Sequence, residues 1–168
     1  SILENKDIIN GHKTRYNCVT DSFVDCSAEG FARDFESFCE ASDERIVDYL
    51  IQTSYKINTS FIESAFFGLS KNKNISNKKY EQLILKYVDY KNYNMCQGIC
   101  NIICNCSNVD WSEKVLDVIC NISLGECDDY SIDTSDNLNN LSTMSMNSFS
   151  GISFRTIVAL VNNHNELC

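Results

Sequence analysis

Proline is absent from this chain of 168 residues, and histidine and glycine are scarce, with two and six copies. Because proline interrupts helices and internal strands, its absence permits long uninterrupted helices. The two histidines, His12 and His164, lie near opposite ends of the sequence in polar surroundings, which is typical of surface histidines. The glycines stand singly, so the sequence contains no glycine-rich loop that could cradle a phosphate.

Several motifs that carry catalysis or metal binding are also missing. The sequence has no C-x-x-C, H-E-x-x-H or G-x-S-x-G pattern, which argues against common zinc sites, thioredoxin-like centres, zinc proteases and α/β-hydrolases. The acidic segment 126–136 lacks the carboxylate spacing and the glycine of a calcium-binding loop. We therefore expect no cofactor, no metal and no enzymatic activity. A secreted hydrolase with an unrecognised site is the remaining enzymatic alternative.

Basic residues are fewer than acidic residues, and the formal net charge is −9. Nucleic acids and anionic membranes both require basic protein surfaces, so neither is an expected partner. No run of 18 apolar residues occurs, so the sequence predicts no membrane span. The acidity keeps a protein soluble and favours a basic partner.

Cysteine, in contrast, is abundant, with ten copies. An even number at this density is typical of disulfide-bonded proteins of oxidising compartments, so the sequence predicts a secreted or extracellular surface location. Cys96, Cys100 and Cys104 are spaced to form one stripe on a helix, which could join that helix to several neighbours. A metal site in this stripe is the alternative. The expected disulfide cysteines are Cys18, Cys26, Cys39, Cys96, Cys100, Cys104, Cys106, Cys120, Cys127 and Cys168.

Asparagine glycosylation patterns agree with an extracellular location without proving it. The pattern N-x-[ST] occurs five times, about as often as chance allows for this composition. The copy at Asn105 is a poor acceptor because it lies within the cysteine cluster. The expected glycosylation sites are Asn58, Asn74, Asn121 and Asn140.

Apolar residues recur at helical spacing along most of the chain and predict an all-α fold. We expect a compact, disulfide-stapled bundle of about six or seven short helices in one cysteine-rich domain, residues 1–168. Residues 1–25 are expected to be irregular, and residues 123–151 to form a long loop, first acidic and then rich in serine and asparagine. Ser27, Ser42, Thr59 or Ser60, and Asp110 are the expected helix caps. The expected apolar faces begin at Phe31, Ile46, Phe61, Tyr80, Met95, Trp111 and Phe154; the last comprises Phe154, Ile157, Val158 and Val161.

Tyr87, Tyr90 and Tyr93 lie close together in the sequence beside Lys86 and Lys91. Exposed tyrosines among mixed charges are common at protein interfaces, so these three are the candidate partner-binding residues. The first functional hypothesis is a secreted, non-enzymatic module that binds another extracellular protein, for example a pathogen ligand or effector acting on a host protein. The alternative is an extracellular carrier that holds a small apolar ligand in a helical cavity.

Overall fold

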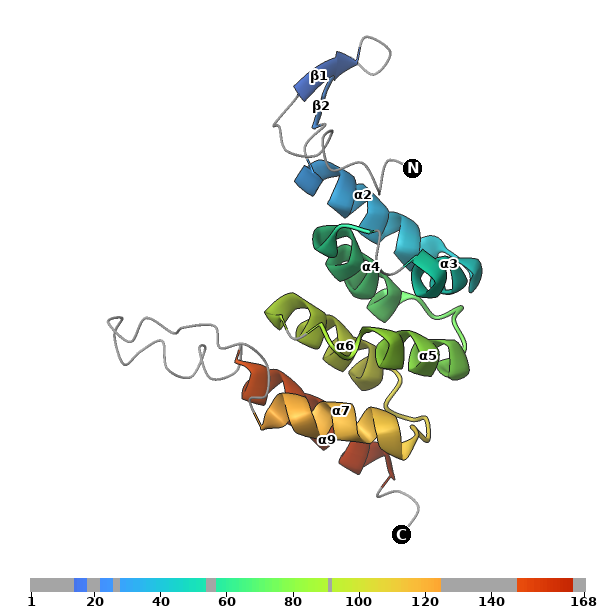
Figure 1. Ribbon diagram of the computed structural model, residues 1–168, viewed down its shortest axis with the longest axis vertical. Helices are drawn as coiled ribbons and strands as arrows, with labels where there is room; N and C mark the ends of the chain where they lie inside the picture. Colours follow the sequence, from blue (N-terminus) through green and yellow to red (C-terminus); the bar gives the residue numbers. More distant parts are fainter. Residues whose placement is uncertain are drawn as a thin grey trace, which may run out of the picture. The chain divides into compact units, whose positions relative to one another are not determined.

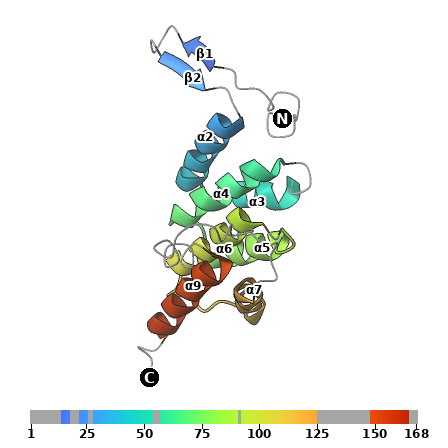
Figure 2. The ribbon, with the colours of Figure 1, turned by 90° about the vertical axis from the view of Figure 1, so that its left-hand side faces the viewer.

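The computed structural model divides the chain into two compact units, Ser1–Asn74 and Ile75–Cys168. It describes residues 14–17, 22–25, 28–53, 57–90, 92–124 and 148–164. Seven helices and one two-stranded sheet make up the regular structure of these residues (Figures 1 and 2). The predicted helical class is confirmed, while the prediction of a single domain stays a prediction.

The first unit contains a hairpin of β1 (Thr14–Asn17) and β2 (Ser22–Asp25), followed by α2 (Ala28–Ala41), α3 (Arg45–Thr53) and α4 (Thr59–Lys71). The two strands pair antiparallel, with Thr14 opposite Asp25. Sequence analysis predicted an irregular segment here, and that prediction is wrong for these strands. Four residues per strand are too few for alternation to stand out from chance.

Helices α2 and α4 approach each other closely at Gly68. A side-chain Cβ at this position would overlap the carbonyl oxygen of Glu36 and lie 3.0 Å from Cβ of Cys39. Only glycine therefore allows this helix contact. At its edge, Lys71 donates a 2.7 Å hydrogen bond to Glu36, which raises the pKa of the lysine.

A buried asparagine, Asn72, ties the end of α4 to the turn between α2 and α3. Its Nδ2 donates to the backbone oxygens of Cys39 at 2.9 Å and Ser42 at 2.7 Å, and its Oδ1 accepts from the amide of Asn74 at 2.7 Å. Ser42, the predicted cap of α3, instead donates its hydroxyl to the carbonyl oxygen of Phe38 at 2.6 Å.

The second unit contains α5 (Asn77–Tyr87), α6 (Tyr93–Asn105), α7 (Glu113–Ser123) and α9 (Phe149–His164). Helix α9 contacts both α6 and α7, and α5 contacts α7. The predicted loop 123–151 is shorter at both ends, because Ser123 belongs to α7 and residues 149–151 belong to α9; residues 125–147 lie outside the described residues. The fully buried large side chains of this unit include Tyr80, Leu83, Ile84, Tyr87, Met95, Ile99 and Ile102.

Two helix starts differ from the prediction. Helix α4 is capped by Asn58, whose side-chain oxygen accepts a hydrogen bond from the amide of Ser60 at 3.0 Å, so neither Thr59 nor Ser60 is the cap. Helix α7 begins after Ser112, not after Asp110. All these residue types are good caps, so composition alone does not choose among neighbours.

The predicted disulfide staples receive no support from the structure. No disulfide joins any two of the six described cysteines, which are Cys39, Cys96, Cys100, Cys104, Cys106 and Cys120. Cys39, Cys96 and Cys100 are instead buried within the helical units, where a thiol packs as a small apolar group. The other four, Cys18, Cys26, Cys127 and Cys168, lie outside the described residues.

Candidate functional site

Helix α9 buries a different face from the one its apolar residues predict. Phe154, Val158 and Val161 are 65%, 40% and 50% exposed, and Ile157 is half-buried. The predicted apolar face of this helix is therefore mostly exposed, since only Ile157 of its four residues is half-buried. The buried residues of α9 are Ile152, Ser153, Thr156 and Leu160.

Two hydroxyl groups explain how α9 can bury this more polar face. Ser153 Oγ donates to the carbonyl oxygen of Ser150 at 3.1 Å. Thr156 Oγ1 lies 3.1 Å from the carbonyl oxygen of Ile152 and 3.3 Å from that of Cys100 on α6. Because both hydroxyls have acceptors, their burial carries little penalty, and the apolar residues of α9 remain at the surface.

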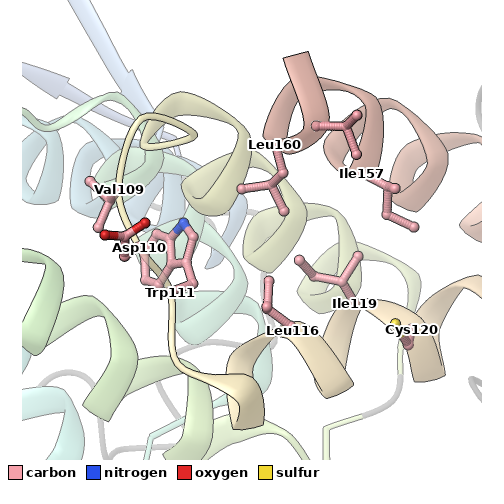
Figure 3. A pocket seen from close by; sticks show the side chains of 9 residues that line it. Val109, Asp110, Trp111, Leu116, Ile119, Cys120, Ile157 and Leu160 are labelled. Atoms are coloured by element: carbon pink, nitrogen blue, oxygen red, sulfur yellow. The ribbon is translucent and has the colours of Figure 1, made fainter. Parts of the chain in front are cut away.

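A pocket of about 490 Å³ opens beside this exposed face, within the second unit (Figure 3). Helices α7 and α9 and the segment before α7 form its walls, and most of its lining is apolar. The lining residues are Val109, Asp110, Trp111, Leu116, Ile119, Cys120, Ile157, Leu160 and Val161.

Trp111, the single tryptophan of the chain, forms one wall of the pocket. Its side chain is buried, with 7% exposure, and its Nε1–H has no hydrogen-bond acceptor among the described residues. In Figure 3 this nitrogen lies on the upper edge of the ring, toward the space between Val109 and Leu160. The adjoining backbone is fixed, because the amide of Ser112 donates to Glu81 Oε1 at 2.7 Å.

Acidic residues border the α7 side of the pocket. Asp110 belongs to the lining, and Glu113 and Asp117 are exposed on α7. Helical spacing places Glu113 next to Leu116 and Asp117 next to Cys120, since each pair is three residues apart. The α7 side of the apolar opening is therefore bordered by negative charge.

The three candidate tyrosines are not equally available to a partner. Tyr87 is completely buried, and burial raises the pKa of its hydroxyl, with a smaller effect from Tyr90. The rings of Tyr87 and Tyr90 lie 5.4 Å apart between centroids. The structure thus does not present Tyr87 to a partner. Tyr90 and Tyr93 are half-buried, and their role stays a prediction.

The glycosylation candidates occupy different environments. Asn74 and Asn121 are exposed, whereas Asn58 is half-buried and caps α4 through its side-chain oxygen. The cap uses only the side-chain oxygen. The side-chain nitrogen, to which a glycan would attach, takes no part in the capping hydrogen bond. Asn140 lies outside the described residues, and glycosylation stays a prediction at all four positions.

The sequence pattern did not reveal the pocket, although most of its wall residues had been singled out for other roles. The apolar spacing assigned Trp111 to a helix face, but the structure places this residue before α7. The available signal was an isolated tryptophan directly after an acidic residue and before a helix cap. That pattern alone does not distinguish a pocket wall from a core residue.

Two structural features are absent from the residues that the structure describes. No group of three or more His, Cys, Asp or Glu side chains among them is placed to hold a metal ion. Of the helices described, none combines the length and the apolar character that a bilayer crossing demands. His12, the side chain of His164 and the acidic segment 126–136 lie outside the described part. Comparisons with protein-family models, curated proteins and solved structures gave no match to this chain.

Proposed function

We propose that this chain is a non-enzymatic module that binds another protein through the exposed side of α7 and α9. We call this surface the α7–α9 face; its residues are Leu116 and Val161, which line the pocket, and Phe154 and Val158, which are exposed on α9. The observation that carries the proposal is the exposure of the apolar stripe of α9. Contiguous exposed apolar surface is characteristic of interaction sites.

The stripe on α9 has the spacing of a helix-binding surface. Phe154, Val158 and Val161 are four and three residues apart, so their side chains follow one side of the helix. Val161 also lines the pocket together with Leu116 of α7. A partner helix could therefore lay an apolar stripe along α9 and insert one side chain into the pocket, as in other helix-in-groove complexes.

The acidic residues near this surface indicate the charge of the expected partner. Asp110, Glu113 and Asp117 lie beside the apolar opening, and the whole chain carries a net charge of −9. We propose a partner helix whose apolar stripe is flanked by Lys or Arg, because opposite charges favour encounter and discriminate against acidic segments.

The extracellular location is a further part of this proposal, and its support is compositional. Ten cysteines are typical of secreted chains, and the glycosylation patterns agree with that location. Intact mass after alkylation tests it on protein purified from its natural source. Labels that appear only after reduction would support the location, whereas labels on the unreduced, unfolded chain would contradict it.

Selection from a displayed library of helical peptides tests the binding surface. The expected peptides carry apolar residues at helical spacing with basic flanks, and they bind the wild-type chain. Val158→Ser should weaken their binding about tenfold or more, as expected for a central apolar contact. The matched control is Leu85→Ser on α5, because Leu85 and Val158 have similar exposures of 36% and 40%.

The same selection has outcomes that would contradict the proposed binding surface or its charge preference. If Val158→Ser and Leu85→Ser weaken binding equally, the α7–α9 face is not the binding site. Selected peptides that are acidic, or that bind equally well to a Glu113→Lys, Asp117→Lys variant, would contradict the proposed charge preference.

A further inference from the structure

The pocket beside Trp111 has features of a small-molecule site that protein binding does not require. Its volume of about 490 Å³ lies within the range of about 300–1,000 Å³ that is usual for such sites. Small-molecule sites are typically apolar with a few polar groups that orient the ligand. Here the apolar walls come from Leu116, Ile157 and Leu160, and the lining residues that carry a polar group are Trp111 and Asp110.

The indole N–H of Trp111 is the distinctive feature of this pocket. It is a donor without an acceptor among the described residues, in a side chain more than nine-tenths buried. Buried tryptophan N–H groups normally have a partner. The nitrogen has almost no contact with solvent, so an acceptor reaches it only after a neighbouring side chain moves.

We propose that this pocket binds a small, neutral, mostly apolar molecule with one hydrogen-bond acceptor, such as a ketone or ester carbonyl, and that Trp111 Nε1–H donates to that acceptor. A carboxylate ligand is disfavoured because Asp110 lines the same pocket and like charges repel. A pure hydrocarbon fits the walls but leaves the indole N–H unsatisfied. The site does not depend on the proposed protein partner.

The test uses three probes of similar size, each with a different group on a phenyl ring. They are acetophenone with a ketone, ethylbenzene with an alkyl group and benzoate with a carboxylate. Because the chain has one tryptophan, its two-dimensional ¹H–¹⁵N spectrum contains one indole N–H resonance. Acetophenone should shift this resonance downfield in a saturable manner, as hydrogen bonding predicts. Ethylbenzene should bind more weakly and cause a smaller shift, and benzoate should bind weakest.

Two variants separate a hydrogen bond from mere filling of space. Trp111→Phe keeps an aromatic wall without the donor, and it should weaken acetophenone binding by roughly three- to tenfold, the effect of one neutral hydrogen bond. Ethylbenzene binding to this variant should change by less than twofold. Ile157→Phe should fill the pocket and weaken both probes, while the control Leu85→Phe on α5 should weaken neither.

Affinities for the Phe variants are measured by ligand-observed magnetic resonance, with far-ultraviolet circular dichroism to check folding. Equal losses of acetophenone and ethylbenzene in Trp111→Phe would overturn the proposed hydrogen bond. No binding of either neutral probe up to its solubility limit would overturn the site. These results leave the peptide selection unaffected, so the pocket and the protein-binding proposal can fail separately.

Discussion

At the scale of single residues, Asn72 and Cys39 show how strongly one buried group can constrain the first unit. Asn72 uses both donor hydrogens and its oxygen on backbone groups of three different residues. Cys39 is completely buried in α2, beside Gly68. Both side chains therefore lie where α2, its following turn and the end of α4 meet.

Replacing Asn72 should destabilise the fold through unsatisfied backbone groups. Asn72→Leu keeps the branched shape of the side chain but removes all three hydrogen bonds, and we expect a loss of about 2–3 kcal/mol in the free energy of unfolding. Asn72→Asp should cost at least as much, because a carboxylate cannot donate to the carbonyl oxygens of Cys39 and Ser42. Urea denaturation measures both losses. A stable Asn72→Asp variant would show that the donor bonds contribute little.

Cys39 should make stability depend on pH in the alkaline range. Burial, with a smaller effect from Glu36, raises the pKa of its thiol from 9.0 to about 12. The unfolded chain thus loses this proton at lower pH than the folded chain, so stability falls as pH rises above about 9. At about pH 10.5 the expected loss is about 2 kcal/mol relative to pH 8.

The measurement compares wild type with Cys39→Ala by urea denaturation at both pH values, in the presence of a reductant. Burial raises the pKa values of Tyr80 and Tyr87 in both proteins, so their effects cancel in the difference. An identical pH dependence in the two proteins would contradict the assignment to Cys39.

At the scale of elements, helix positions could be predicted from apolar spacing, but the buried face of α9 could not. Each predicted helix has a counterpart in the structure, because apolar periodicity follows from one-sided burial. In α9 the buried face contains Ser153 and Thr156, whose hydroxyls are satisfied by backbone oxygens. A hydropathy pattern counts those residues as exposed, since it contains no information about hydrogen-bond partners.

The candidate site could not be predicted because it depends on which distant segments of the chain come together. The pocket combines the segment before α7 with residues of α7 and of α9, which follows a long connection in the sequence. Apolar wall residues such as Leu160 resemble core residues in sequence. Only their placement shows that they border an opening.

Substitutions on the two sides of α9 should have unequal effects on stability. Ile152→Ala removes a buried side chain, and we expect a loss of about 2–4 kcal/mol. Val158→Ala truncates a 40% exposed side chain, and we expect a loss below about 1 kcal/mol. Thermal or urea denaturation distinguishes them. Reversed magnitudes would show that α9 packs through the face that the sequence pattern favoured.

At the scale of the whole molecule, the net charge of −9 should act on association more than on folding. Salt screens interactions between exposed charges, with a Debye length of about 10 Å at 0.1 M. Raising the salt concentration should therefore slow the association of a selected basic peptide severalfold while leaving its dissociation rate nearly constant. Stopped-flow or surface-based kinetics measures both rates.

Acetophenone serves as the control for the salt series because it is neutral, and its affinity should change little over the same range. A peptide whose association rate is independent of salt would contradict electrostatic guidance by Asp110, Glu113 and Asp117. Comparing the two ligands separates the effect of the charges around the opening on binding from the effect of the apolar surface within it.

The division of α9 into a packed side and an exposed side has an evolutionary consequence. Ile152, Thr156 and Leu160 are buried within the second unit, whereas Phe154 and Val158 lie at its surface. Mutations at the exposed positions can therefore accumulate without loss of the fold. Among descendants of this chain, the buried side should remain nearly constant while the exposed side diverges with the partner, and selection for new binding could proceed rapidly on a fixed scaffold.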